Sequence, residues 1–189
     1  MAPKSKYTVP GMDEAAATKV AGTLQDRLNA LLDLSLTLKH VHWNVVGPNF
    51  IGVHQMLDPQ VDAVRAMADA VAERIATLGF EPWGTPGYIA THRSWDDYSI
   101  GRAGTLEHLA ALDLAYNGLN ADHRKAIEEF DDLDPVTQDL LIAQSEQLEL
   151  FQWLVRAHLE DSSGQLRHAE AKTEQEATEA AGGDANVGG

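Results

Sequence analysis

The chain contains no cysteine, which excludes disulfides, thiolate metal ligands and cysteine nucleophiles. No run approaches the roughly eighteen apolar residues that a membrane-spanning helix needs. Residues 1–12 are polar and include Pro3 and Pro10, so they lack the apolar centre of a signal peptide. These absences predict a cytoplasmic protein with no membrane partner.

Basic residues are scarce as well. The 189 residues include 14 Lys and Arg against 29 Asp and Glu, a formal net charge of −15. Such a balance repels nucleic acid and concentrates cations near the surface. Acidity that serves solubility alone is one interpretation, and acidity that attracts a metal cation is the other. The length suits one well-buried domain.

Four long segments repeat apolar residues at helical spacing and predict an all-α fold. They cover residues 15 to about 46, about 50 to 78, 105 to 130, and 134 to about 159. Gly47-Pro48-Asn49 separates the first two, and Asp134-Pro135 supplies the cap and first residue of the last. Four such helices with one long crossover are typical of a ferritin-like four-helix bundle.

The remaining segments are less regular. Pro59 lies inside the second helix and predicts either a kink near Asp58 or a helix that starts only there. The Gly- and Pro-rich crossover at residues 79–104 predicts a short helix around residues 94–98. Residues 1–14 are expected to form a flexible tail before the bundle of residues 15–160. Residues 161–189 are expected to form an acidic tail that is disordered or loosely draped.

The most informative pattern is a stripe of imidazole and carboxylate side chains on the second helix. At 100° per residue, five positions fall within roughly 100° of one another: His54, Asp58, Asp62, Asp69 and Glu73. His42 lies a short turn upstream. This mixture of ligands suits iron, zinc or manganese, so the stripe predicts a metal site. The alternative is an exposed acidic face, since like charges four residues apart cost only about 0.2–0.5 kcal/mol.

A di-iron centre inside one ferritin-type bundle needs a Glu-x-x-His pair on each of two helices. None of the eight histidines has Glu three residues before it. Either the residues of the stripe are not metal ligands, or a second subunit completes the site. The six histidines without a matching carboxylate pattern are interpreted as ordinary polar positions: His40, His92, His108, His123, His158 and His168.

Three stretches in register carry a resemblance to a known family. They are the run from Leu38 to Phe50 with His42-Trp43-Asn44 inside it, Val53-His54, and Asp69-Ala70-Val71-Ala72-Glu73-Arg74-Ile75 with Leu78-Gly79. From about residue 15 to 160 the chain resembles the Dps family, the ferritin-like DNA-binding proteins from starved cells, and in particular its actinobacterial members. The resemblance implies a hollow homododecamer that stores iron and protects DNA from oxidative damage.

The resemblance also implies a ferroxidase whose sites lie between two subunits related by a two-fold axis. Fe(II) and hydrogen peroxide would be the substrates, and ferric mineral would collect in the shell. His42 and His54 of one chain would face Asp58, Asp69 and Glu73 of its neighbour. Among these, Asp58 is also a candidate for a supporting position outside the ligand set.

Further roles follow from the same resemblance. Trp43 would either intercept stray oxidising equivalents or pack in the core. Asp134 and Asp139 would line pores on three-fold axes, where copies of aspartate focus cations. Asp134 is also interpreted as the cap of its helix, which its position predicts without any pore.

DNA binding is expected to be weak and salt-sensitive, or absent. Only Lys4 and Lys6 lie in the N-terminal tail, and multivalency in the shell would support them. From residue 160 onward, seven acidic residues stand against Arg167 and Lys172. A nucleoid-associated DNA-binding protein with secondary iron chemistry is one competing function, and this tail charge argues against it. A different metal-dependent enzyme on the same scaffold, such as a hydrolase, is the other.

Overall fold

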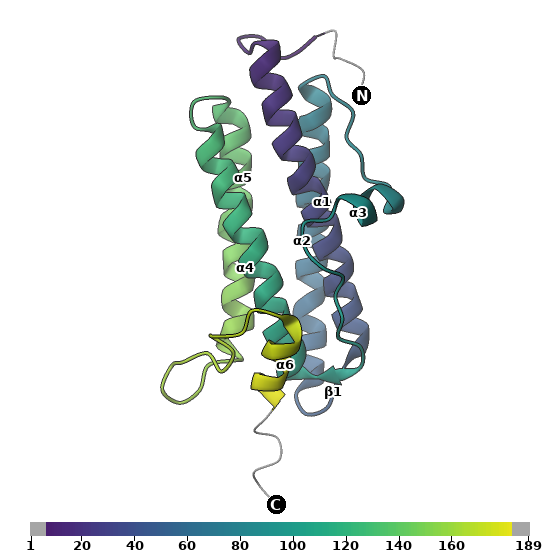
Figure 1. Cartoon of the computed structure of the whole chain (residues 1–189), viewed down its shortest axis with the longest axis vertical. Helices are drawn as coiled ribbons and strands as arrows, with labels where there is room; N and C mark the ends of the chain where they lie inside the picture. The colour runs from purple at the N-terminus through teal and green to yellow at the C-terminus, as the bar shows by residue number, and fades with distance from the viewer. Residues whose placement is uncertain (1–6, 183–189) are drawn as a thin grey trace, which may run out of the picture. The chain divides into compact units, whose positions relative to one another are not determined.

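The computed structural model describes residues 7–182 and is mostly helical (Figure 1). Its helices and strands are α1 (Glu14–Asn44), β1 (Val45–Val46), α2 (Phe50–Thr77), α3 (Pro86–His92), β2 (Ala103–Gly104), α4 (Thr105–Phe130), α5 (Pro135–Ala157) and α6 (Glu174–Gly182). The four long helices predicted from apolar spacing are confirmed to within about two residues at each end. None of the helices in residues 7–182 is long and apolar enough to cross a membrane.

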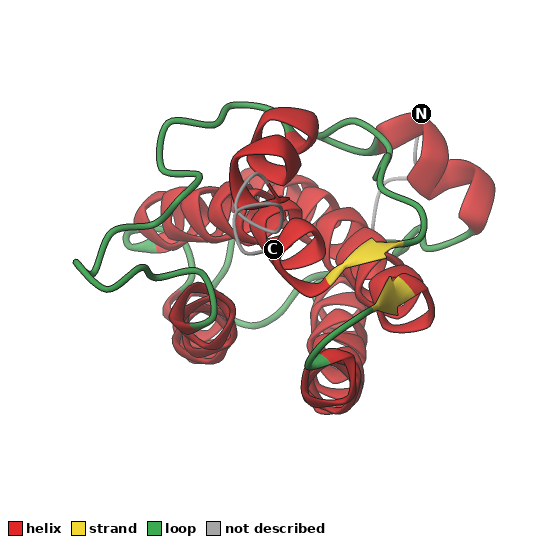
Figure 2. Cartoon of the chain, turned by 90° about the horizontal axis from the view of Figure 1, so that it is seen from below, coloured by secondary structure: helices red, strands yellow, loops and turns green. Residues whose placement is uncertain are grey.

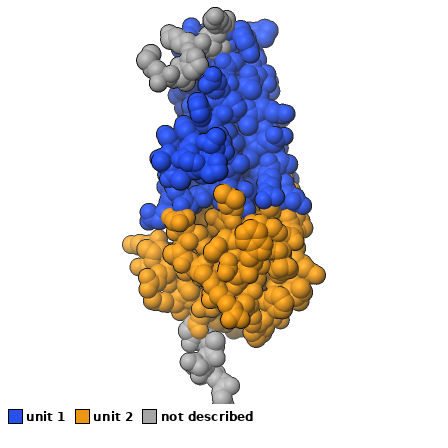
Figure 3. Space-filling view, turned by 90° about the vertical axis from the view of Figure 1, so that its right-hand side faces the viewer, with its two compact units in different colours: residues 1–35, 62–96, 121–146 blue, residues 36–61, 97–120, 147–189 orange. Residues whose placement is uncertain are grey.

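The chain forms two compact units (Figure 3). Each unit contains segments of the four long helices. Unit 1 comprises residues 1–35, 62–96 and 121–146, and unit 2 comprises residues 36–61, 97–120 and 147–189. Unit 1 buries Leu24, Leu31, Val71, Ile75 and Phe130, whereas unit 2 buries Leu38, Leu57, Leu112, Tyr116 and Leu148. Burying one such side chain stabilises the fold by about 1.5–3 kcal/mol, so each unit has an apolar core of its own.

The turn between α1 and α2 forms as the sequence predicts. Gly47 has a φ of 90° and Asn49 a φ of 64°, in the left-handed region that glycine and asparagine tolerate best. Gly79 has a φ of 90° directly after α2. There the Phe80 amide donates to the Ile75 carbonyl at 3.1 Å, which closes the end of the helix.

Pro59 does not start α2, so that alternative is wrong. The helix begins at Phe50 and continues through Pro59. Proline removes the hydrogen bond to the carbonyl four residues earlier, at Gln55. Both Gln55 and Pro59 are exposed, so water can reach that carbonyl while the opposite face of α2 stays packed.

The prediction of a short helix at residues 94–98 is also wrong, because the short helix of the crossover is α3. Pro86 begins it, and Arg93 follows it with an extended backbone, φ −70° and ψ 148°. The Arg93 guanidinium donates to both carboxylate oxygens of Asp33, with one nitrogen at 2.8 and 2.9 Å. This ion pair fixes the chain just where the helix was expected to begin.

Two further features were not predicted from the sequence. In unit 2, β1 and β2 form a parallel pair in which Val45 aligns with Ala103 and Val46 with Gly104 (Figure 2). Residues 161–182 are not a loosely draped tail, because they include α6 and bury Ala177, Ala181 and His168. Strands of two residues leave no alternating pattern, and alanine burial leaves no strong apolar signal.

Candidate metal centre

The two histidines of the predicted site meet in unit 2. His42 lies in the last turn of α1, and His54 lies in the first turns of α2. Their rings stack with centroids 3.6 Å apart and planes inclined by 23°. His42 is buried, whereas His54 is partly exposed. The short turn between the helices therefore brings together two imidazoles that are twelve positions apart in the chain.

Reciprocal hydrogen bonds fix both rings. Nδ1 of His42 lies 2.9 Å from the carbonyl oxygen of His54, and Nδ1 of His54 lies 2.9 Å from the carbonyl oxygen of His42. A carbonyl oxygen only accepts, so each Nδ1 carries the proton and donates it. In a neutral imidazole this leaves Nε2 with its lone pair, which is the form that binds a metal ion.

Asp58 lies with these histidines rather than with the other predicted carboxylates. Its Oδ1 is 3.3 Å from Nδ1 of His42 and 2.6 Å from Nζ of Lys39 in the same chain. The side chain is 51% exposed, and the hydrogen bond from Lys39 lowers the pKa of Asp58. The expectation that Asp58 faces the histidines from the neighbouring chain is thus corrected: it contacts the Nδ1 side of its own His42.

The acidic part of the predicted site lies in unit 1. Asp69 and Glu73 are exposed on α2, as is Asp62. Because a helix rises about 1.5 Å per residue, His54 and Asp69 are roughly 22 Å apart along α2. Within the described residues, no three His, Asp or Glu side chains gather where they could hold one ion. The predicted ligand set is therefore split into two separate parts within one chain.

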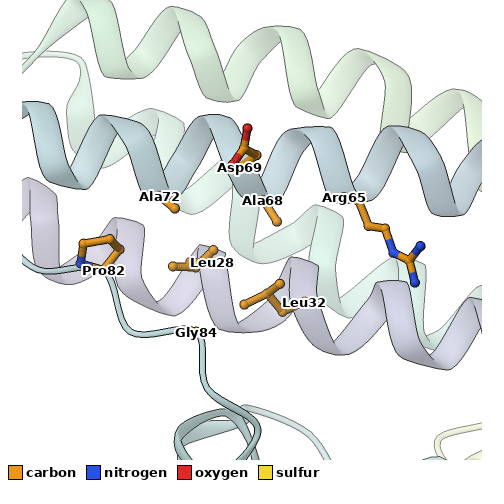
Figure 4. Close-up of a pocket in the computed structure, with 8 residues that line it drawn as sticks. All are labelled: Leu28, Leu32, Arg65, Ala68, Asp69, Ala72, Pro82 and Gly84. Atoms are coloured by element: carbon orange, nitrogen blue, oxygen red, sulfur yellow. The ribbon is translucent and has the colours of Figure 1, made fainter.

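A cavity of about 320 Å³ lies beside Asp69 in unit 1 (Figure 4). Its lining is Leu28, Leu32, Arg65, Ala68, Asp69, Ala72, Pro82 and Gly84. Arg65 and Asp69 are the charged members of this otherwise apolar lining. A hollow of this kind places Asp69 at the edge of a recess rather than on a flat acidic face.

Trp43, next to His42, is 71% exposed. Core packing within this chain is therefore excluded as its role. Exposed apolar residues share unit 2 with it: Leu36, Phe50 and Ile51. A large aromatic ring held in water beside two candidate ligands stays a candidate for a redox or interface role.

The two predicted pore residues differ sharply. Asp139 is exposed on α5, whereas Asp134 is only 5% exposed. Asp134 accepts hydrogen bonds from Arg74 at 2.6 Å, from the Val136 amide at 3.3 Å and from the Thr137 hydroxyl. Assembly can only bury Asp134 further, so the pore role predicted for it is wrong and its capping role is confirmed.

Some interpretations of the remaining residues change, and some stay untested. Lys4 and Lys6 lie outside the described residues. His108, His123 and His168 are not ordinary polar positions, because all three are buried. Tyr98 contacts Nδ1 of His108 at 3.0 Å, and Asp113 contacts Nε2 of His168 at 2.9 Å. Ten and 55 positions separate these partners, so no local spacing pattern could have revealed them.

Known proteins resemble this chain in sequence and in fold. The ferritin-like domain family matches residues 21–164. The DNA protection during starvation protein of Mycolicibacterium smegmatis is 59% identical over 177 residues, which cover 94% of this chain and 97% of that protein.

Two solved structures extend the comparison. Mycobacterium smegmatis Dps aligns with a TM-score of 0.88 and 60% identity, over 90% of this chain and 97% of that one. DpsA14 from Streptomyces coelicolor aligns with a TM-score of 0.85 and 59% identity, over 88% and 99%. The matches confirm the ferritin-like fold predicted from the four helices. The chain belongs to the ferritin-like family of DNA protection during starvation proteins, the Dps family.

Proposed function

We propose that this protein oxidises Fe(II) with hydrogen peroxide at sites shared between two subunits and stores the ferric product in a twelve-subunit cage. Membership of the Dps family supports iron storage and DNA protection in general. The observation that carries the finer proposal is the histidine pair. Both imidazoles are fixed through Nδ1, which leaves Nε2 of each neutral ring as the metal-binding atom, yet among residues 7–182 no set of carboxylates gathers around them.

A two-fold axis resolves this mismatch, because it supplies each chain's missing ligands from the other. His42 and His54 of one subunit would bind Fe(II) together with Asp69 and Glu73 of the partner subunit. Imidazole and carboxylate oxygen suit ferrous iron, and a set this small leaves coordination positions open to an oxidant. Asp69 and Glu73 are exposed rather than packed in the core, so a partner subunit can reach them.

The proposed reaction uses two Fe(II) ions as substrate for each molecule of hydrogen peroxide. Each Fe(II) gives one electron, the O–O bond breaks, and two protons convert the oxygens to two molecules of water. Pairing the electrons in this way releases no hydroxyl radical. The protein's part is to hold the ions, to keep the imidazoles in the ligating tautomer and to provide carboxylates that offset the growing positive charge.

Asp139 is proposed to line the route by which iron enters the cage. It is exposed on the first turns of α5, near exposed Asp131 and Asp132. Three copies around an axis would focus cations there. Lys4 and Lys6 are proposed as the carriers of weak, salt-sensitive DNA contacts.

Complementation between two defective variants tests the shared site. One chain carries His42→Ala with His54→Ala, and the other carries Asp69→Ala with Glu73→Ala. We expect neither assembly alone to oxidise Fe(II) at the site. Subunits unfolded and reassembled together in equal amounts should recover about a quarter of the sites, since half of random pairs are mixed and each mixed pair has one intact site.

Stopped-flow oxidation of Fe(II) by peroxide gives the measure, with each variant reassembled alone as the matched control. Size-exclusion mass confirms that mixed and single assemblies have the same size. No recovery in mixed assemblies of normal size would refute a site shared across the two-fold axis. Wild-type rates of Fe(II) oxidation in both single-variant assemblies would show that these residues are not ligands.

Trp43 gives a separate test of how the site handles oxidising equivalents. Replacing it with Phe should leave Fe(II) oxidation intact but raise carbonyl formation elsewhere in the protein after peroxide and excess Fe(II). Exposed Trp83→Phe, in unit 1, is the matched control. Equal protein oxidation in wild type and Trp43→Phe, measured by mass spectrometry, would remove the protective role of Trp43.

A further inference from the structure

The C-terminal segment is built into unit 2, although its composition is that of a tail. His168 is 3% exposed, and Ala177 and Ala181 of α6 are buried. A free arm would expose such residues to water. The segment is therefore held by specific contacts, and these contacts lead toward the histidine pair.

The first fastening point is Asp113, a buried carboxylate on α4. Its Oδ2 accepts from Nε2 of His168 at 2.9 Å. Its Oδ1 accepts from Nε2 of Gln152 at 2.8 Å and from Nε of Arg156 at 2.7 Å, both on α5. A buried carboxylate needs such donors, so this cluster ties the C-terminal segment to two long helices.

The second fastening point is Glu174 in the first turn of α6. Its Oε2 accepts from both the amide and the hydroxyl of Ser99, each at 2.9 Å. At the other end of α6, a Cβ on Gly182 would lie 3.4 Å from Cγ of Glu107. The helix α6 thus lies against the crossover and the start of α4.

The crossover in turn holds the end of α1. Nε2 of His40 donates to the carbonyl oxygen of Ile100 at 2.8 Å, and the His40 and Tyr98 rings pack edge to face at 5.7 Å. Directly after α1, β1 pairs with β2 of the crossover. His42 lies between these two attachments, two positions from His40.

We propose that residues 161–182 form a strap that positions the crossover and, through His40 and β1, the turn of α1 that carries His42. Asp113 and Glu174 are positioning residues in this arrangement, since they act on His42 only through the crossover. The packing of the strap stands on the contacts above. Its effect on iron rests on the proposed function.

Hydrogen exchange of the full-length assembly tests the packing. Glu174→Ala and, separately, His168→Ala should speed amide exchange at residues 97–107 about tenfold, with a smaller rise at residues 38–46. Glu179→Ala removes an exposed carboxylate from the same helix and should change neither peptide. His168→Gln keeps a donor toward Asp113 and should restore most of the protection. If amides 97–107 exchanged as slowly in both alanine variants as in wild type, the proposed strap would be wrong.

Anaerobic Fe(II) titration tests the link to His42. We expect the alanine variants to bind Fe(II) about three- to tenfold more weakly than wild type. This loss is smaller than the one usually caused by removing a residue that hydrogen-bonds a metal ligand directly. The oxidation rate at saturating Fe(II) should stay unchanged. Faster exchange with unchanged Fe(II) affinity would overturn the positioning role. If wild-type protein bound no Fe(II), the proposed function would fail, while the exchange data would still decide the strap.

Discussion

The histidine pair in unit 2 and the acidic pair in unit 1 solve the same problem in opposite ways. His42 and His54 are stacked and fixed by two reciprocal hydrogen bonds before any ion arrives. Asp69 and Glu73 are exposed on one helix. An imidazole offers one lone pair in one direction and must be oriented, whereas a carboxylate offers about four acceptor positions and can rotate toward an ion. In the proposed site, the directional imidazoles are therefore held rigidly and the carboxylates are left free to adjust.

Removing one residue from either pair should cause the greatest loss of activity and should separate the two pairs by stability. His42→Ala and Asp69→Ala should each slow Fe(II) oxidation by more than about a hundredfold. Removing a residue that only hydrogen-bonds a ligand typically costs less than that. Their stabilities should differ. His42→Ala leaves the His54 carbonyl without its donor and should cost about 1–3 kcal/mol, while Asp69→Ala should stay within about 0.5 kcal/mol.

Urea unfolding of the two variants provides the measurement, with Asp62→Ala as a surface control on the same helix. Equal destabilisation by His42→Ala and Asp69→Ala would contradict the view that only the histidines are held in advance. A shift in assembly size would require the comparison to be made at matched size.

A second effect concerns the anchoring of α2 next to Glu73. Arg74 and Asp134 form a largely buried ion pair in unit 1. Asp134→Ala should cost about 3–5 kcal/mol, because it leaves the Arg74 charge without its partner. Asp139→Ala, on the same helix, should cost less than about 0.5 kcal/mol and slow iron uptake instead. Thermal unfolding and uptake kinetics of the two variants separate the effects.

Acid should weaken the same anchor. Burial raises the pKa of Asp134, but hydrogen bonds from Thr137 and Arg74 outweigh it, so the net pKa is lowered. The ionised form therefore adds stability that is present above the ordinary aspartate pKa of about 3.9 and is lost as the pH falls through the lower folded value. Asp134→Asn should lack this acid transition, and an unchanged acid profile would contradict the assignment.

A smaller effect is expected at His108, which is buried in unit 2. Burial lowers the pKa of His108, whose Nδ1 lies 3.0 Å from the Tyr98 hydroxyl. Below about pH 6.5 this histidine binds a proton in the unfolded chain but stays neutral in the folded chain. The free energy of unfolding therefore falls as the pH drops below that value. His108→Gln should flatten this slope between about pH 6.5 and 5. His158→Gln, at an exposed position, is the control, and equal slopes in wild type and His108→Gln would argue against the buried neutral form.

The smallest effect is expected at Asp58. It contacts Nδ1 of His42, not the Nε2 proposed to bind iron, and it forms an ion pair with Lys39. Asp58→Asn should weaken Fe(II) binding by no more than about threefold in anaerobic titration. A loss as large as that of Asp69→Ala would instead make Asp58 a direct ligand.

Much of the fold was predictable because its signals are local. Apolar residues at helical spacing mark α1, α2, α4 and α5, and Gly47, Gly79 and Asp134-Pro135 mark their ends. The position of α3 was not, because it depends on Arg93 reaching Asp33, 60 positions away. The packed C-terminal segment was missed for the same reason, since His168 reaches Asp113 over 55 positions.

For the candidate site, residue spacing alone was enough to tell which residues share a helix face and that the chain carries no Glu-x-x-His pair. The reason is that helical phase is fixed by residue spacing. Three facts required the folded chain: the reciprocal hydrogen bonds of His42 and His54, the contact of Asp58 with His42, and the burial of Asp134. Those outcomes depend on which backbone carbonyls and charges meet in space, and spacing along the chain does not encode such meetings.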